Sequence, residues 1–89
     1  MYQIYTLPEC EHCHEALKII KEKGIQLEQI NAGSSEGMKK FRDFYAKYRE
    51  QVKRDNSGCA VLPILVYQDD KFLAIHQGTE GLERFLGMQ

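Results

Sequence analysis

The spacing of hydrophobic residues changes along the chain, and each change predicts a different element. The aromatic and β-branched run Tyr2–Thr6 is typical of a strand, which Pro8 ends. From Cys10 to Lys23 apolar positions recur every three or four residues, which predicts a helix that Gly24 terminates. Leu27–Ile30 alternates again and predicts a second short strand.

A longer amphipathic helix is predicted over Ser35–Arg54, after a cluster of turn residues. Its apolar stripe consists of Met38, Phe41, Tyr45, Tyr48 and Val52. Asn56–Gly58 is expected to end this helix, because asparagine, serine and glycine favour turns.

The last third of the chain predicts a hairpin and a closing helix. Strands at Ile64–Tyr67 and Phe72–Ile75 are joined across two aspartates, which suit a hairpin turn. Thr79 can cap a final helix, and Gly87 is expected to stop it. The apolar face of that helix consists of Leu82, Phe85 and Leu86.

In order, these elements read βαβαββα, which predicts an α/β fold. Parallel strands need a helical crossover, whereas the last two strands need only a hairpin. We therefore expect one mixed four-stranded sheet flanked by helices on both faces. Eighty-nine residues suit a single domain, which we expect to span residues 1–89.

Composition and charge argue against several classes of protein. Apolar residues make up 43%, which argues against disorder, and a formal net charge of −1 argues against generic nucleic-acid binding. No apolar run approaches a membrane span, and the N-terminus lacks the pattern of a signal peptide. Three cysteines are an odd count, unlike a secreted disulfide framework. We expect a cytoplasmic monomer with reduced thiols and no membrane contact.

The most informative motif is Cys10-Glu11-His12-Cys13, at the start of the first predicted helix. Cysteines at this spacing are close enough to bridge, and the N–H groups and dipole of a helix N-terminus favour a thiolate. Such a pair can make and break a disulfide. Cys10 lies nearest the loop and is the expected attacking thiolate. Cys13 falls on the apolar stripe and is the expected resolving thiol.

Together with the element order, these residues resemble the thioredoxin superfamily, and the glutaredoxins most closely. The resemblance rests on Tyr5–Cys13, on Val61–Pro63 before a strand, and on Gly78–Glu80 before the last helix. It implies a thioredoxin-like, glutaredoxin-type fold and a thiol–disulfide oxidoreductase acting on protein or glutathione mixed disulfides. It implies no bound cofactor, and glutathione or a thioredoxin-type reductase as the reductant.

The resemblance also implies a substrate site beside the motif. In that family the proline entering the third strand follows a cis peptide bond, so Leu62–Pro63 is expected to be cis and to lie against Cys10. The backbone of Leu62 would pair with an extended substrate. Pro63, Gly78 and Thr79 complete the expected substrate-binding residues.

The chain departs from the glutaredoxin pattern around Cys10. Glu9 stands where that family usually has lysine, and Glu11-His12 replaces the usual proline and tyrosine. Glu9 and Glu11 disfavour an anion, whereas a protonated His12 favours one, so these three residues are expected to modulate Cys10. Without the lysine and tyrosine with which that family contacts glutathione, we expect weak recognition of glutathione and preference for a protein disulfide.

Several alternatives stay open on the sequence. The same two cysteines could serve a non-enzymatic metal or iron–sulfur carrier, and Cys10–His14 also matches the C-x-x-C-H pattern of haem attachment. Cys59 is either a bystander or a third redox thiol. Lys39–Arg54 carries seven basic and two acidic residues, which suits a solvated face or a docking surface for an acidic partner.

Overall fold

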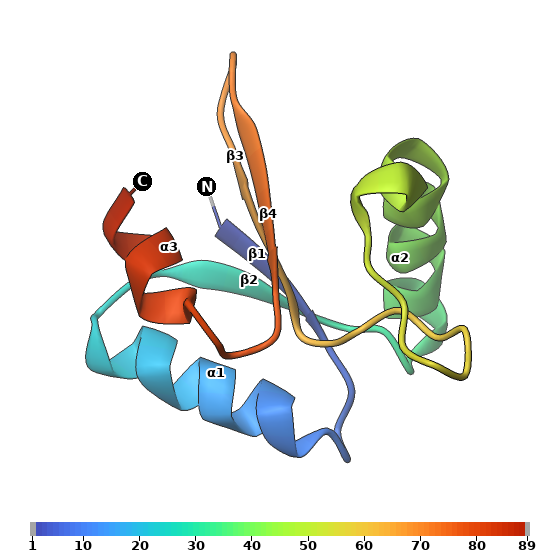
Figure 1. Ribbon diagram of the computed structural model, residues 1–89, viewed down its shortest axis with the longest axis horizontal. Helices are drawn as coiled ribbons and strands as arrows, with labels where there is room; N and C mark the ends of the chain where they lie inside the picture. The colour runs from blue at the N-terminus through green and yellow to red at the C-terminus, as the bar shows by residue number, and fades with distance from the viewer. Residues whose placement is uncertain (1, 89) are drawn as a thin grey trace.

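The computed structural model describes residues 2–88, and within them the predicted βαβαββα order is confirmed (Figure 1). In chain order the elements are β1 (Tyr2–Thr6), α1 (Glu11–Glu22), β2 (Leu27–Asn31), α2 (Ser35–Tyr48), the 3₁₀ helix η1 (Arg49–Gln51), β3 (Ile64–Gln68), β4 (Leu73–Gln77) and α3 (Leu82–Met88). Over this range, no helix has the length and apolar character needed to cross a membrane.

The strands form one mixed four-stranded sheet in the order β2-β1-β3-β4. β1 pairs in parallel with β2 and antiparallel with β3, and β3 pairs antiparallel with β4. In this register Tyr5 lies opposite Ile30 on one side and Ile64 on the other. Because β1 and β3 are antiparallel, the residues that follow β1 and those that precede β3 come to the same edge of the sheet.

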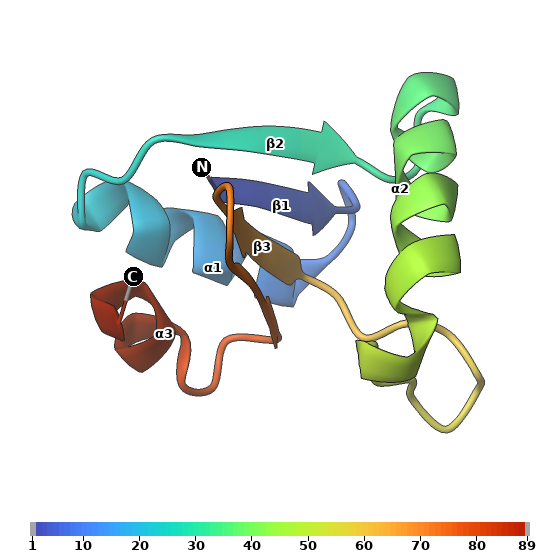
Figure 2. The same ribbon diagram turned by 90° about the horizontal axis from the view of Figure 1, so that it is seen from above.

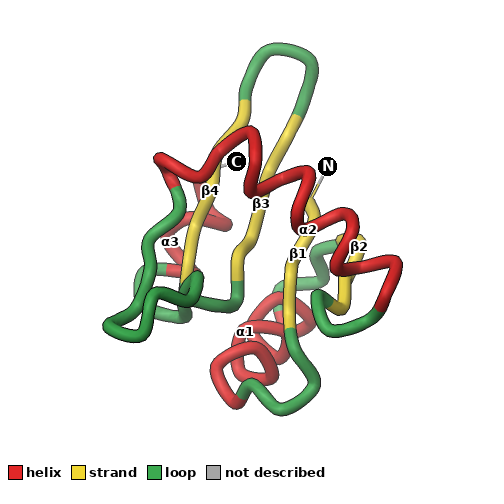
Figure 3. The backbone as a smooth tube through the Cα atoms, turned by 90° about the vertical axis from the view of Figure 1, so that its right-hand side faces the viewer, coloured by secondary structure: helices red, strands yellow, loops and turns green. Residues whose placement is uncertain are grey.

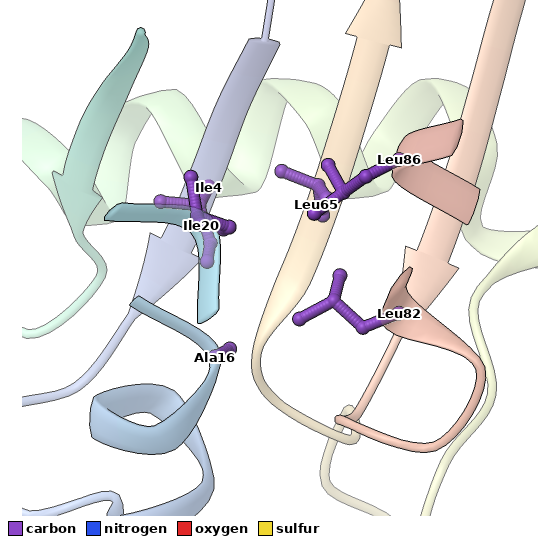
Figure 4. Packing of buried hydrophobic residues seen from close by; sticks show 6 residues of the cluster. All are labelled: Ile4, Ala16, Ile20, Leu65, Leu82 and Leu86. Carbon is purple, nitrogen blue, oxygen red and sulfur yellow. The ribbon is translucent and has the colours of Figure 1, made fainter. Parts of the chain in front are cut away.

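Helices cover both faces of the sheet, as predicted (Figures 1 and 3). α1 and α3 pack on one face, over a buried cluster of Ile4, Ala16, Ile20, Leu65, Leu82 and Leu86 (Figure 4). α2 packs on the other face, at the end towards which β1 and β2 run (Figure 2). The buried cluster there consists of Tyr5, Ile30, Phe44, Val52, Ile64 and Val66.

The predicted apolar stripe of the second helix is confirmed in large part, since Phe41, Tyr45, Tyr48 and Val52 pack into the core on this face. Phe44, which lay off that stripe, is only 7% exposed, whereas Met38 is 41% exposed. The ring of Tyr5 contacts both Phe41 and Phe44, with centroids 5.6 and 5.0 Å apart. The face of α2 towards the sheet therefore includes Phe44 but not Met38, and Tyr45 is half-buried.

The second helix is also shorter than predicted. It ends at Tyr48, η1 follows, and Val52 is buried beyond both in an extended conformation. Arg54 then forms an isolated antiparallel bridge with Ala60. Asn56–Gly58 thus lies at the tip of a loop rather than at a helix end.

The hairpin of β3 and β4 is confirmed, but its second strand starts later than predicted. Phe72 lies in the turn and is 51% exposed. The final helix begins at Leu82, so Thr79 is not its cap; the C=O of Thr79 accepts the N–H of Leu82. Gly81 intervenes with a positive φ of 77°. Gly87 lies inside α3 and does not end it.

Candidate active site

The loop after β1 and the first turn of α1 hold both cysteines of the motif. The N–H of Cys10 donates to the C=O of Leu7 at 3.2 Å, and the C=O of Cys10 accepts from His14 at 3.2 Å. Cys10 is the N-cap of α1, with extended backbone at φ −84° and ψ 110°. Its side chain thus stands where serine or aspartate usually caps a helix.

The Cys10 sulfur lies directly against the N-terminus of α1. Its Sγ accepts a hydrogen bond from the N–H of Cys13 at 3.2 Å. The first N–H groups of a helix have no partner within the helix, and the helix dipole is positive at this end. The half-buried Cys10 side chain therefore occupies a place that suits an anion.

Cys13 has a different environment, on the buried side of α1. Its side chain is 1% exposed, which confirms that it is shielded. Burial raises the pKa of the Cys13 thiol to about 12, and hydrogen bonding to Cys10 and negative charge on Cys10 act in the same direction. Cys13 therefore keeps its proton at neutral pH. Both cysteines are free thiols in this structure.

The side chains expected to modulate Cys10 all lie at the surface. Glu9, Glu11 and His12 are exposed, and none forms an ion pair with another residue of the described chain. His14 instead turns back onto the loop, with its Nε2 2.7 Å from the C=O of Pro8. The modulating role of the three exposed residues stays a prediction.

The Leu62–Pro63 peptide bond is cis, as expected from the family resemblance. Pro63 is buried and directly precedes β3. Since Tyr5 near the end of β1 pairs with Ile64, Pro63 and the loop that carries Cys10 lie at the same edge of the sheet. Among residues 2–88, neither the N–H nor the C=O of Leu62 has a hydrogen-bond partner.

Gly78 and Thr79 follow β4 at this edge. Gly78 has a positive φ of 79°, and its N–H donates to the C=O of Pro63 at 3.0 Å. Two of the expected substrate-binding residues, Pro63 and Gly78, are thereby brought into direct contact. Thr79 comes next in the chain and is half-buried.

Cys59 lies in an exposed loop. The Oδ1 atom of Asp55 accepts hydrogen bonds from the N–H of Cys59 at 3.1 Å and from Ser57, which stabilises this loop. Across the described part of the chain, histidine, cysteine, aspartate and glutamate side chains nowhere form a group of three or more suited to a metal ion.

Sequence reasoning missed Gln77, the last residue of β4. Its side chain makes three hydrogen bonds to main-chain atoms of the segment that leads to Pro63. Its partners Lys53 and Val61 lie 24 and 16 residues away in sequence, so no local pattern marks this role.

A CxxC pair at the start of the helix that follows the first strand, at the same edge of the sheet as a cis-proline, is typical of a thioredoxin-fold dithiol protein. The glutaredoxin family model matches residues 3–72, and the chain belongs to this family. Among solved structures it is similar to the glutaredoxin-like protein NrdH-redoxin from Escherichia coli. That match has 21% identity and a TM-score of 0.60, over 93% of this chain and 91% of the other. Among curated proteins, no sequence matches significantly.

Membership of the glutaredoxin family assigns thiol–disulfide redox chemistry to the chain, and a thiol oxidoreductase activity in general terms. Proteins of this kind act on disulfide substrates together with redox partners. The similarity to NrdH-redoxin supports the thioredoxin-like, glutaredoxin-type fold.

Proposed function

We propose that this protein is a cytoplasmic dithiol oxidoreductase that reduces protein or glutathione mixed disulfides with Cys10 and Cys13. The observation that carries the proposal is the unequal environment of the two sulfurs. Cys10 caps α1 with its Sγ on the N–H of Cys13, whereas Cys13 is buried and its pKa is raised to about 12. This difference supports Cys10 as the attacking sulfur and Cys13 as the resolving sulfur.

The reaction proceeds in two thiol–disulfide exchanges. The Cys10 thiolate attacks one sulfur of the substrate disulfide, which forms a mixed disulfide with Cys10 and releases the other half as a thiolate that takes a proton from water. Cys13 then loses its proton to water and attacks the sulfur of Cys10. The second half leaves as a thiol after protonation, and Cys10 and Cys13 remain as a disulfide. Two electrons have passed to the substrate.

The first exchange prepares the second. Hydrogen bonding to Cys10 and negative charge on Cys10 both raise the pKa of Cys13. Both contributions are lost once the Cys10 sulfur is part of a mixed disulfide, which carries no charge. The pKa of Cys13 therefore falls when its nucleophilic form is needed, although burial continues to raise it.

The substrate lies against the edge of the sheet where Leu62, Pro63, Gly78 and Thr79 meet. Leu62 offers an N–H and a C=O without partners in the described chain. An extended peptide that carries the disulfide can pair with these groups as a short added strand. This supports a protein or peptide disulfide as the preferred substrate.

The proposed reductant of the Cys10–Cys13 disulfide is a thioredoxin-type reductase in preference to glutathione. Glu9 and Glu11 flank Cys10 and are exposed, so they repel an anionic tripeptide. NrdH-redoxin is described as a glutaredoxin-like protein with a thioredoxin-like activity profile. We extend that profile to this chain.

Trapping with single-cysteine variants tests the proposal. Cys13→Ser should still attack a disulfide through Cys10 and should accumulate mixed disulfides, because the resolving thiol is absent. Cys10→Ser should form none and should lose disulfide reduction. Non-reducing gels and mass spectrometry after mixing with a peptide disulfide distinguish the two.

Cys59→Ser is the control, since Cys59 is exposed and lies outside the motif. This variant should reduce disulfides like the wild type and should form the Cys10–Cys13 bridge on mild oxidation. A dominant bridge between Cys59 and either motif cysteine in the wild type would contradict the assignment.

A further inference from the structure

The side chain of Gln77 joins the end of β4 to the segment that leads to Pro63. Its Oε1 accepts the N–H of Lys53 at 2.7 Å. Its Nε2 donates to the C=O of Lys53 at 3.0 Å and to the C=O of Val61 at 2.9 Å. One amide side chain thus binds both main-chain groups of one residue and the carbonyl of another.

These bonds close the base of the loop between η1 and β3. The N–H of Val61 also donates to the C=O of Lys53 at 3.1 Å, and Arg54 bridges Ala60. Lys53 and Val61 therefore form the two sides of a short antiparallel ribbon, and Gln77 holds both sides against β4. Local preferences within the loop do not explain why Lys53 is bound here, because Gln77 is 24 residues away from it in sequence.

Gly78, the residue directly after β4, binds the residue on the other side of Leu62. Gly78 donates its N–H to the C=O of Pro63 at 3.0 Å. Val61 and Pro63, the two neighbours of Leu62, are thus bound by the consecutive residues Gln77 and Gly78. Within residues 2–88, Leu62 between them keeps its own N–H and C=O without partners.

We propose that Gln77 is a positioning residue for peptide substrates: it holds Val61 so that the main chain of Leu62 faces an incoming extended peptide. This inference rests on the proposed function and specifies how the substrate site is built. Gln77 touches neither sulfur, so it acts on peptide binding and leaves the attack by Cys10 unchanged. A glycine at this position could make none of the three hydrogen bonds, so the positioning of Val61 depends on the amide side chain of Gln77.

Two substrates separate positioning from general structural support. One is 2-hydroxyethyl disulfide, which has no peptide backbone to pair with Leu62. The other is a short peptide whose central cysteine is disulfide-bonded to 2-mercaptoethanol. In Gln77→Ala, kcat/KM for the peptide should fall about two- to tenfold through KM, the loss expected for one main-chain hydrogen bond. The kcat/KM for 2-hydroxyethyl disulfide should stay at the wild-type value.

Gln3→Ala is the matched control, because it removes one side-chain amide that bonds to Glu28 on the sheet surface. It should change neither rate. An equal fall for both substrates in Gln77→Ala, or no fall for either, would overturn the inference. A wild-type protein that reduces neither substrate would instead contradict the proposed function, and the inference with it.

Gln77→Glu covers the case in which the alanine variant does not fold. Glutamate keeps an acceptor for the N–H of Lys53 but cannot donate to the carbonyls of Lys53 and Val61. The same difference between the two substrates is expected. Loss of folding in both variants, seen by circular dichroism, would assign the side chain to stability alone and would overturn the positioning role.

Discussion

At the scale of single residues, position decides the chemistry of two cysteines that are three residues apart. Cys10 precedes the first helical residue and its sulfur faces the free N–H groups of α1. Cys13 lies one turn further on, where the helix faces the sheet, and is 1% exposed. Burial disfavours a charged sulfur, whereas a helix N-terminus favours one. The same side chain therefore serves two roles.

This difference predicts the order in which the thiols of the folded, reduced protein are alkylated. Iodoacetamide reacts with thiolates. With a pKa of about 12, Cys13 is a thiolate in about one molecule in ten thousand at about pH 8. Cys10 and Cys59 should be labelled first, and labelling of Cys13 should increase only as the pH rises towards that pKa. Fragmentation mass spectrometry locates the labels.

Protein unfolded in urea is the control for this experiment. All three cysteines should then react at similar rates, because burial and the contact with Cys10 are lost. Labelling of Cys13 in the folded protein as fast as that of Cys59 would contradict the shielded, protonated state.

At the scale of elements, the connection from β2 to α2 is unusually close. Ser34 caps α2 by accepting the N–H of Gly37 at 3.0 Å, and its hydroxyl donates to the C=O of Asn31 at 2.9 Å. A Cβ at Gly37 would overlap the C=O of Asn31, which is main chain and cannot move aside cheaply. Glycine at this position allows the first turn of α2 to pack on the end of β2.

Gly37→Ala should therefore destabilise the fold, by about 1–3 kcal/mol as for other overpacked sites. For a domain of this size each kcal/mol lowers Tm by roughly 4–8 °C. Thermal denaturation followed by circular dichroism measures the change. Gly87→Ala is the control, because Gly87 lies within α3 and, apart from its chain neighbours and the backbone of that helix, no described atom lies within 4 Å of its Cβ position. That variant should be unchanged or more stable, since alanine favours a helix. Equal stability of the two variants would contradict the close contact.

At the scale of the whole molecule, charge is unevenly distributed although the formal net charge is only −1. The segment Lys39–Arg54 has seven basic and two acidic residues, which leaves five basic and eleven acidic residues elsewhere. Those seven basic side chains are exposed, and within the described chain only Lys40 among them forms an ion pair, with Glu28 at 3.1 Å. Next to Cys10 in the sequence, Glu9 and Glu11 are exposed. We expect these two carboxylates to repel an anion that approaches Cys10.

Glu9→Lys should raise the rate at which Cys10 reacts with glutathione disulfide by at least about fivefold at low salt. Removal of one close exposed negative charge contributes on the order of 1 kcal/mol, which is about fivefold, and the positive charge of lysine adds to it. Added salt should reduce the difference because it screens exposed charges. Stopped-flow measurements at several ionic strengths test this. Glu22→Lys makes the same charge change at the far end of α1, about 18 Å from residue 10 along the helix axis. It should have little effect, and an equal effect of both variants would contradict a local cause.

The sequence by itself determined the elements that short-range forces build. β1 and α1 were predicted with their bounds nearly correct, because alternation and helical periodicity act between residues a few positions apart. The placement of Cys10 at the helix start and of Cys13 on the buried side followed from the same local pattern. The cis bond before Pro63 followed from family resemblance, which rests on motif residues that are also local in sequence.

Only the tertiary structure decided where α2 ends, that Phe44 is buried, and which main-chain groups the side chain of Gln77 binds. The helical pattern continued to Arg54, but the main chain of Lys53 bonds to Gln77 and Val61 instead of to the preceding turn. Phe44 is buried in a cluster with residues of β1, β2 and β3, and its ring lies against that of Tyr5. A periodicity shows which side of an element is apolar, but not which distant carbonyl or ring meets it. Such pairings form only when the strands have assembled into the sheet.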